Sequence, residues 1–273
     1  MQTKWLLIIT AVAVFGCKKG KDVVPKPPPV IALPVVLLKD IEELNLPSPY
    51  YHFEYNADSS VSLVSFAAEF KKYQVSYANG RIGELTDSIG GLAEKIQYFY
   101  DSDGRVSMVY YVDLSGNIYV KVYFTYQGNQ LTKLERQRKL GSDFVVNKTL
   151  SFSYYPDGNV KLITDNRPAI TGVQVESTTT DLFEQYDTGR NVDGFTLIHN
   201  DFFDHLILLP AVVFQKNNPL KESVTSDTFT YSTTNVYTYN DRKLPSRKDA
   251  NVIFTSGANA GQSFQSATDY SYY

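Results

Sequence analysis

Two histidines and two aspartates stand close together near position 200 and form the densest group of possible metal ligands in the chain. Imidazole and carboxylate groups can together hold a divalent metal ion and the water that it activates for hydrolysis. Their spacing argues against that chemistry, because the two histidines are six residues apart, whereas a helical zinc pair needs i, i+4 spacing. A loop whose aspartates cap a short helix fits better. The four residues are His199, Asp201, Asp204 and His205.

The sequence shows no other catalytic constellation. It has no Gly-x-Ser-x-Gly elbow around a nucleophilic serine and no glycine-rich loop for phosphate. The run Asp101-Ser102-Asp103-Gly104 begins like a calcium loop, but Val112 stands where that loop requires glutamate, so a hairpin turn explains it better. We therefore expect no enzyme, no catalytic residue and no cofactor.

The single cysteine, Cys17, ends a short N-terminal segment with the features of a processing signal. Lys4 supplies a positive charge, and residues 5–16 form an uncharged run of 12 residues, which is shorter than the membrane-spanning length of about 20 residues. This junction resembles the lipobox of bacterial lipoproteins, in which the cysteine is lipidated. The resemblance implies a signal peptide over residues 1–16 and a lipid anchor on Cys17. The alternative is an ordinary signal peptide followed by an incidental cysteine.

Residues 17–49 have the composition of a spacer between that anchor and a folded domain. The segment holds seven of the 12 prolines of the chain, which favour polyproline II. Within it, Leu37, Ile41 and Leu44 have the i, i+4, i+7 spacing that predicts one short amphipathic helix.

The net charge of the chain and the residue that follows Cys17 limit the possible locations and partners of the protein. The formal charge of −3 excludes nucleic-acid binding by bulk charge, because no basic excess exists to release counterions. Lys18 stands where an aspartate would resemble the inner-membrane retention signal of lipoproteins, so a cell-envelope protein of the outer membrane is preferred. Whether it faces the periplasm or the surface stays open. The expected partners are the membrane, through the anchor, and a protein or glycan.

Tyrosine is the outlier of the composition, with 21 Tyr against a single Trp. An apolar-x-Tyr triplet recurs along the chain, and its first five tyrosines are spaced by 22, 23, 26 and 28 residues. Cross-strand packing of these rings is the favoured interpretation, and stacking on sugar rings is the alternative. The repeat-defining tyrosines are Tyr55, Tyr77, Tyr100, Tyr126, Tyr154, Tyr239 and Tyr272.

Turn residues follow the triplets. Asn79-Gly80 and Asp103-Gly104 supply the positive φ of tight hairpins. The pattern predicts a mainly all-β domain over residues 50–273, with roughly 12 to 16 strands in an antiparallel hairpin-repeat meander that forms an extended, twisted open sheet. Residues 166–228 break the period and predict one irregular or helical insertion, whose apolar run 206–214 is expected to be a buried plug or strand.

The run Tyr100-Asp101-Ser102-Asp103-Gly104-Arg105-Val106 resembles the YD repeat of Rhs-type proteins, and Tyr155-Pro156-Asp157-Gly158-Asn159-Val160 is a second instance. The whole chain resembles uncharacterised Bacteroidota lipoproteins that carry degenerate YD-like repeats in a domain of unknown function. The resemblance covers about residues 50–273. It implies a hairpin-repeat domain in a cell-envelope lipoprotein and says little about activity.

Three functional hypotheses follow. The first is a lipid-anchored cell-envelope protein that acts without catalysis, as a binding or scaffolding module. The second is a ligand carrier or glycan-binding lipoprotein, with the ligand held under residues 182–218. The third is the metal-dependent hydrolase. A long apolar cavity would favour the second, and convergence of the two histidines and two aspartates would favour the third.

Overall fold

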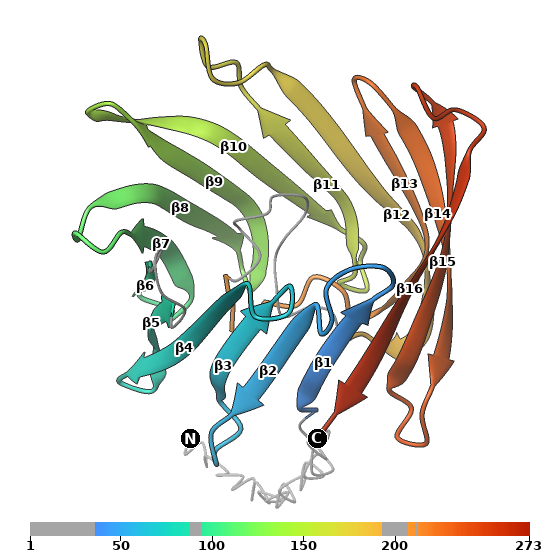
Figure 1. Cartoon of the computed structure of the whole chain (residues 1–273), viewed down its shortest axis with the longest axis horizontal. Helices are drawn as coiled ribbons and strands as arrows, with labels where there is room; N and C mark the ends of the chain where they lie inside the picture. The colour runs from blue at the N-terminus through green and yellow to red at the C-terminus, as the bar shows by residue number, and fades with distance from the viewer. Residues whose placement is uncertain (1–35, 88–93, 193–206, 211) are drawn as a thin grey trace, which may run out of the picture. The chain divides into compact units, whose positions relative to one another are not determined.

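Sixteen antiparallel strands make up the described part of the chain, and they close into a barrel (Figure 1). The structure is a computed structural model that describes residues 36–87, 94–192, 207–210 and 212–273. The strands are β1 (Leu38–Glu43), β2 (Tyr51–Tyr55), β3 (Val61–Phe66), β4 (Lys71–Ala78), β5 (Arg81–Asp87), β6 (Lys95–Tyr100), β7 (Val106–Val112), β8 (Ile118–Gln127), β9 (Gln130–Leu140), β10 (Asp143–Tyr154), β11 (Val160–Arg167), β12 (Ser177–Arg190), β13 (Asn217–Ser226), β14 (Thr230–Tyr239), β15 (Pro245–Ser256) and β16 (Ser263–Tyr272).

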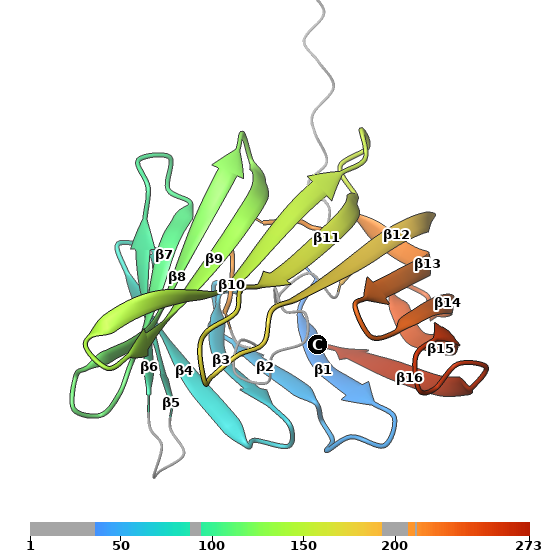
Figure 2. The same cartoon turned by 90° about the horizontal axis from the view of Figure 1, so that it is seen from above.

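Each strand pairs with its neighbours in the sequence, and the last strand returns to the first. β1 lies antiparallel to β16, with Leu38 opposite Tyr272 and Glu43 opposite Thr268. Figure 1 and Figure 2 show from two directions how the strands pass round a common interior. The closed sheet has no free edge, so its backbone ladders are satisfied within the barrel.

The predicted open sheet with a helical insertion is therefore wrong. Hairpin signals are local: they identify strands that are neighbours in the sequence, and they do not reveal whether the first and last strands meet. β1 lies outside the tyrosine repeat, so the strand that closes the barrel carries no repeat signal. Within the described ranges the chain forms no helix, and so none that is long and apolar enough to cross a membrane.

The short helix predicted around Ile41 is also a strand. Leu38 and Ile41, which are 0% and 8% exposed, are both core residues on β1. The register of β1 against β16 shifts between Leu38 and Asp40, which marks a β-bulge. The bulge places the two buried residues three positions apart, so β1 lacks the alternation of a regular strand. Two of the three residues that predicted the helix, Leu37 and Leu44, are not core residues, and Leu44 is exposed. Residues 38–49, which the sequence assigned to the spacer, accordingly belong to the barrel and its first connection.

The insertion predicted for residues 166–228 contains two long strands in place of an irregular or helical segment. β12 and β13 pair with each other, and three register shifts interrupt their ladder between Phe183 and Arg190. These irregularities remove the regular spacing that marks the other hairpins, while the strands themselves persist.

Residues 207–210 and 212–214, between β12 and β13, pack in the interior of the barrel. We call residues 207–214 the plug segment, because their buried members belong to the same hydrophobic core as the strands. The expected burial of this apolar run is confirmed for them, whereas Leu206 and Ala211 lie outside the described residues. The buried members are Ile207, Leu208, Leu209 and Phe214.

The hairpin turns have the conformations that their sequences predict. Asn79 and Gly80 both have positive φ, at 52° and 74°, which suits a two-residue hairpin loop. In the next turn the Asp101 carboxylate accepts hydrogen bonds from the backbone N–H groups of Asp103 and Arg105, at 3.0 and 2.9 Å. The run that resembles the start of a calcium loop is thus a hairpin turn.

The inner side of the sheet holds the hydrophobic core. Residues opposite each other on neighbouring strands share one side of a sheet, so the register carries each side around the barrel. Phe53 lies opposite Val64, and Leu85 lies opposite Ile96, and all four are at most 1% exposed. Together with the plug segment they form one contiguous core.

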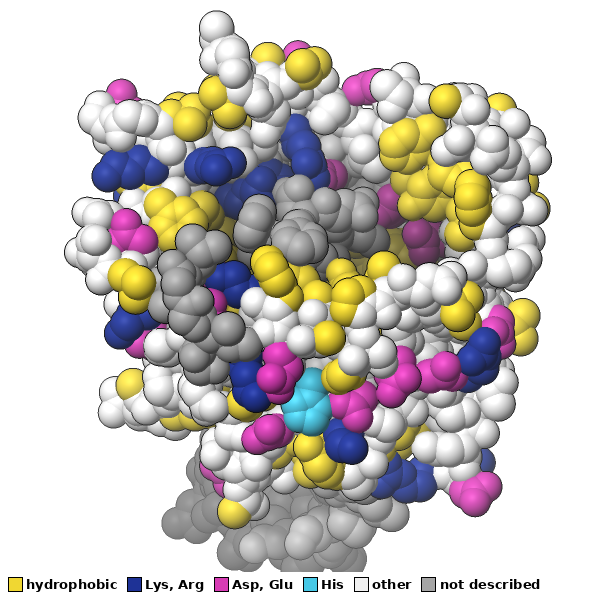
Figure 3. All heavy atoms as spheres, in the orientation of Figure 1, with side chains coloured by type: hydrophobic (Ala, Val, Ile, Leu, Met, Phe, Trp, Pro, Cys, Tyr) yellow, Lys and Arg dark blue, Asp and Glu magenta, His cyan; other side chains and the backbone are white. Residues whose placement is uncertain are grey.

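The outer side is polar and charged, as Figure 3 shows for one face. Ion pairs cross the ladders at separate places around the barrel, and isolated hydrophobic residues such as Phe99 and Val236 lie between them. The cross-strand pairs on this side are Lys95 with Glu84 at 3.0 Å, Lys221 with Glu184 at 3.0 Å, and Arg247 with Asp269 at 2.9 Å.

Two N-terminal truncations, one that removes β1 and one that keeps it, test the closure of the barrel. A chain that begins at residue 50 lacks the partner of β2 and β16. It loses the burial of Leu38 and Ile41, which contributes about 3–6 kcal/mol in total, and it exposes two strand edges. We expect urea unfolding to show a loss of that size, with aggregation on gel filtration. A chain that begins at Val36 is the control and keeps full stability; equal stability of the two would contradict closure through β1.

Candidate functional site

One end of the barrel gathers the repeat tyrosines, the plug segment and the point at which the described chain begins, at Val36. Even-numbered strands end there and odd-numbered strands begin there, so the tight turns of the repeat share this end. Every repeat-defining tyrosine is the last or the last but one residue of an even-numbered strand. We call this end of the barrel the tyrosine end.

The hydroxyls of these tyrosines bridge neighbouring strands. Tyr77 on β4 donates to the carbonyl of Val61 at the start of β3, at 2.9 Å. The same contact, which we call the tyrosine clasp, recurs from other even-numbered strands to the preceding odd-numbered strand. The further clasps are Tyr55 to Leu38 (2.8 Å), Tyr100 to Ile82 (2.9 Å), Tyr126 to Val106 (2.8 Å), Tyr154 to Leu131 (2.7 Å), Tyr186 to Val160 (2.6 Å) and Tyr272 to Pro245.

Each clasp lies beyond the point where the backbone ladder between its two strands ends. The ladder of β3 with β4 runs only from Phe66 to Leu63, and the Tyr77 side chain reaches Val61 past that limit. A register shift directly before Tyr77 in its other ladder marks a bulge that redirects the chain there. The side chain thus replaces backbone pairing where the two strands diverge.

Tyr239 is the exception among the repeat-defining tyrosines. Its hydroxyl meets the carboxylate of Asp187 and accepts a hydrogen bond from the Asn218 side chain, at 2.9 Å. Burial, with the neighbouring Asp187 carboxylate, raises the pKa of Tyr239 to about 12. Gly189 lies so close to the Tyr239 ring that a Cβ there would overlap with it, so glycine leaves room for the ring.

Arginines that follow the turns stack on the clasp tyrosines. The Arg81 guanidinium lies 5.2 Å from the centre of the Tyr100 ring, and that of Arg105 lies 5.0 Å from the centre of Tyr126. Arg105 also pairs with the carboxylates of Asp101 and Asp103, both at 2.8 Å. Among the described residues, Arg81 has no such carboxylate partner.

A pocket of about 510 Å³ opens beside Arg81 at the tyrosine end. Its described lining contains two arginines, Arg81 and Arg190, and no aspartate or glutamate. Most of its lining surface is apolar, and the lining comes from the first described residue, three hairpin turns of the tyrosine end, the end of β12 and the plug segment. The described lining residues are Val36, Ser59, Ser60, Val61, Tyr77, Gly80, Arg81, Ile82, Tyr100, Gly104, Arg190, Asn191, Val192, Leu208, Leu209, Pro210, Val212, Val213 and Gln215.

Hydrogen bonds hold the plug segment against the inner wall. The backbone N–H of Leu208 donates to the hydroxyl of Tyr98, a buried residue of β6, at 2.9 Å. The backbone N–H of Val160 donates to the carbonyl of Phe214 at 2.7 Å. The Phe214 ring packs on Phe152, with 5.1 Å between the ring centres. The wall that the plug segment adds to the pocket is therefore fixed at both ends.

The residues considered for metal and lipid chemistry lie elsewhere in the chain. His199, Asp201, Asp204 and His205 lie outside the described residues, as does Cys17. In the described ranges, no group of three or more His, Cys, Asp or Glu side chains is placed to hold a metal ion.

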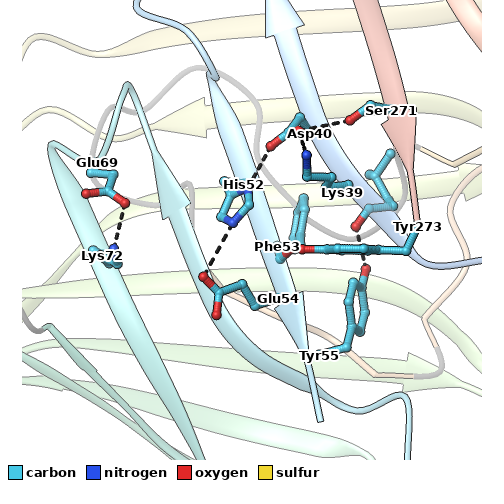
Figure 4. Close-up of polar contacts among 11 residues, drawn as sticks. Lys39, Asp40, His52, Phe53, Glu54, Tyr55, Glu69, Lys72, Ser271 and Tyr273 are labelled. Carbon is cyan, nitrogen blue, oxygen red and sulfur yellow. Dashed lines mark hydrogen bonds and ion pairs between the residues drawn. The ribbon is translucent and has the colours of Figure 1, made fainter. Parts of the chain in front are cut away.

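His52 is the histidine that the structure describes, and it lies on the outer wall at the closing seam (Figure 4). Its Nδ1 is 2.6 Å from the Asp40 carboxylate, which also accepts a hydrogen bond from Ser271 at 2.9 Å. In a nucleophilic triad the histidine lies between the serine and the aspartate. Here Ser271 contacts Asp40, and Nε2 of His52 lies 3.5 Å from Glu54, so the arrangement differs from a triad. Partial burial acts to raise the pKa of Asp40, but the contacts with His52 and Ser271 hold it below its usual value.

The barrel is similar to two crystal structures of porin-like proteins. The one from Bacteroides uniformis ATCC 8492 has a TM-score of 0.57 and 15% sequence identity, over 82% of this chain and 89% of that chain. The one from Bacteroides vulgatus ATCC 8482 has a TM-score of 0.56 and 13% identity, over 88% of this chain and 99% of that chain. No protein-family model and no curated protein matches the sequence. At these identities the likeness establishes a shared fold.

Removing one clasp hydroxyl tests its contribution to stability. Tyr154→Phe deletes the donor to Leu131 and keeps the ring, so we expect a loss of about 1 kcal/mol in the free energy of unfolding. Tyr110→Phe is the matched control, because the Tyr110 hydroxyl has no hydrogen-bond partner among the described residues, and it should cost less than about 0.5 kcal/mol. Equal losses in urea unfolding would contradict a role for the clasp.

The clasps also predict loss of stability in alkali. Burial raises the pKa of Tyr55, Tyr126 and Tyr154 above the usual value. The unfolded chain then loses these protons from about pH 10, while the folded chain keeps them to higher pH, so the unfolded state binds fewer protons and stability falls as pH rises. Urea unfolding should show a stability that declines above about pH 9.5. A stability that does not fall above about pH 9.5 would contradict this account.

Proposed function

We propose that the protein is a lipid-anchored barrel of the bacterial cell envelope that stands in water and binds a ligand without catalysis. The distribution of side chains over the two sides of the barrel supports the proposal. Membrane-spanning β-barrels have an apolar outer side and a polar interior. Here most buried hydrophobic residues face inward and charged pairs occupy the outer wall. The inner side also holds buried pairs, Lys71 with Asp87 and Lys148 with Asp165, so the charge of the outer wall is the feature that carries the proposal.

Charge on the outer wall weighs against contact with lipid chains. Lys95, Lys221 and Arg247 form ion pairs around the outer side, and Lys133 pairs with Glu135 there at 2.8 Å. A lysine or arginine on the lipid face of a barrel costs about 2–4 kcal/mol at the bilayer midplane. Four such residues would offset most of the roughly 5–15 kcal/mol by which a typical domain is stable.

The lengths of the strands also weigh against a barrel that spans the bilayer. β1 to β7 have between five and eight residues, whereas a strand needs about 9–11 residues to cross a bilayer. Nearly half of the barrel is therefore too short to span, although its fold is similar to that of the porin-like proteins.

The place in the cell follows from the N-terminal segment and forms part of the proposal. Lipidation of Cys17 would tether the barrel, and the proline-rich spacer would separate it from an envelope membrane, preferably the outer one. The hairpin turn of Asp101 and Arg105 supports the proposed membership of Bacteroidota lipoproteins with YD-like repeats.

The pocket at the tyrosine end favours ligand binding over a purely scaffolding role. It is the feature that the sequence hypothesis of a ligand carrier requires: a cavity of about 510 Å³ with mostly apolar walls, within the range of about 300–1,000 Å³ common for ligand sites. The plug segment, which lies in residues 182–218, forms part of its lining.

Cleavage of the spacer tests the tether and the water-facing wall together. With a protease site placed between residues 20 and 33, we expect cleavage of washed membranes to release the intact barrel into the aqueous phase without detergent. Cys17→Ser should leave the membrane fraction without any cleavage, because the variant lacks the lipidated thiol. Retention of the cleaved barrel in the membrane pellet would contradict the proposal.

A further inference from the structure

We infer that the pocket at the tyrosine end takes a single acyl chain with an anionic head group, and that Arg81 contacts the head. The inference rests on the proposed binding role and names the class of ligand. Three features of the pocket carry it: the chemistry of its walls, the sign of its charge, and the fixed position of one guanidinium.

The walls match an acyl chain better than a sugar. Most of the lining surface is apolar, and Val61, Ile82 and Leu208 are among the aliphatic residues that contribute to it. The two aromatic rings belong to Tyr77 and Tyr100, and both hydroxyls already donate to backbone carbonyls in clasps. The Tyr100 ring also carries a stacked guanidinium. A sugar would need a free aromatic face and several free hydrogen-bonding groups, whereas an aliphatic chain needs only apolar contact.

The charge of the lining selects an anion. Arg81 and Arg190 are the charged side chains in the described lining, which contains no aspartate or glutamate. Arg190 has a further contact of its own, so Arg81 is the charge that a ligand can meet. Arg105 is a useful comparison. It follows the turn between β6 and β7 as Arg81 follows the turn between β4 and β5, and its guanidinium also stacks on a tyrosine ring. Arg105 is neutralised by Asp101 and Asp103. The two-residue turn before Arg81 carries no acid, so the charge of Arg81 remains available to a ligand.

Arg81 is held in position before any ligand arrives. Its guanidinium lies between the Tyr100 ring and Gly104, where an added Cβ would be 2.7 Å from Nη2. Gly104 has a φ of 82°, so the turn requires glycine, and its lack of a side chain leaves room for the guanidinium. A guanidinium fixed by stacking loses little entropy when it binds a carboxylate or phosphate in a bidentate manner.

The pocket also leaves apolar surface uncovered. Tyr77 and Val213, which line it, are 38% and 54% exposed. Val36, the first described residue, lies in the same lining. An acyl chain from a bilayer lipid and a free fatty acid share the chemistry required, and they differ in the head group.

Photolabelling of the full chain in phosphatidylcholine vesicles tests the inference. Three probes share one diazirine-bearing C16 chain: a fatty acid, a lysophosphatidic acid and an uncharged monoacylglycerol. The two anionic probes distinguish a free carboxylate from a phosphate head. We expect both, or one of them, to label peptides from the plug segment in a saturable manner and more strongly than the neutral probe.

Two matched pairs of variants make the test specific. R81Q should reduce anionic labelling about tenfold, the usual effect of losing a charge-assisted contact, while R105Q should leave it unchanged. At the exposed position Val213, V213E should reduce the same labelling and V213K should preserve it, and neither disturbs the core.

Two outcomes would overturn the inference. Equal labelling by anionic and neutral probes, with no effect of R81Q or V213E, would show that Arg81 does not contact the head group. No saturable labelling by any probe would remove the acyl site. Neither result bears on release of the barrel by spacer cleavage, which tests the proposed function separately.

Discussion

The pairing of β1 with β16 is the contact on which the rest of the structure depends. It converts a row of hairpins into a surface with an inside and an outside, at a seam where Asp40 binds both His52 and Ser271. Once the sheet is closed, the alternation of side chains along each strand gives every residue one of two environments. The inner side packs around the plug segment as one core, and the outer side carries ion pairs. The inner side also holds buried charged residues, among them Lys71 with Asp87 and Lys148 near Asp165, so the interior combines an apolar core with a polar part.

The tyrosine end combines stability with the means to bind. Clasps such as Tyr100 to Ile82 hold strands together beyond their backbone ladders. The same rings provide platforms for the arginines that follow the turns. At Arg105 the platform supports a closed ion pair, whereas at Arg81 it presents an uncompensated charge to a pocket. The turn before Arg105 carries two aspartates and the turn before Arg81 carries none. Arg105 is therefore held in ion pairs, whereas Arg81 lines the pocket without such a pair.

The sequence predicted the local features of this fold and missed the long-range ones. Asn79-Gly80 and the Asp101 turn depend on positive φ and on hydrogen bonds between near neighbours, so their motifs were sufficient. Closure depends on β1, which lies far in sequence from its partner β16. The bulge at Leu38 also hides the alternation that would have marked β1 as a strand. The pocket was anticipated only as a cavity under residues 182–218. The sequence signal for Arg81 was present, since it follows a turn glycine as Arg105 does, but its significance required the missing carboxylate to be seen in space.

Labelling of single cysteines on the barrel wall tests the central claim most directly, because Cys17 is the only native thiol and would be blocked by lipid. Gln74, Ser151 and Thr234 are exposed positions on β4, β10 and β14, and Val109 is a buried control. In native membranes, the account predicts that a water-soluble maleimide labels the three wall positions rapidly and Val109→Cys slowly, and that fluorophores on the wall are not quenched by brominated lipids. Protection of the wall positions from the maleimide, with quenching by the lipids, would show that the wall lies in the bilayer and would contradict the account.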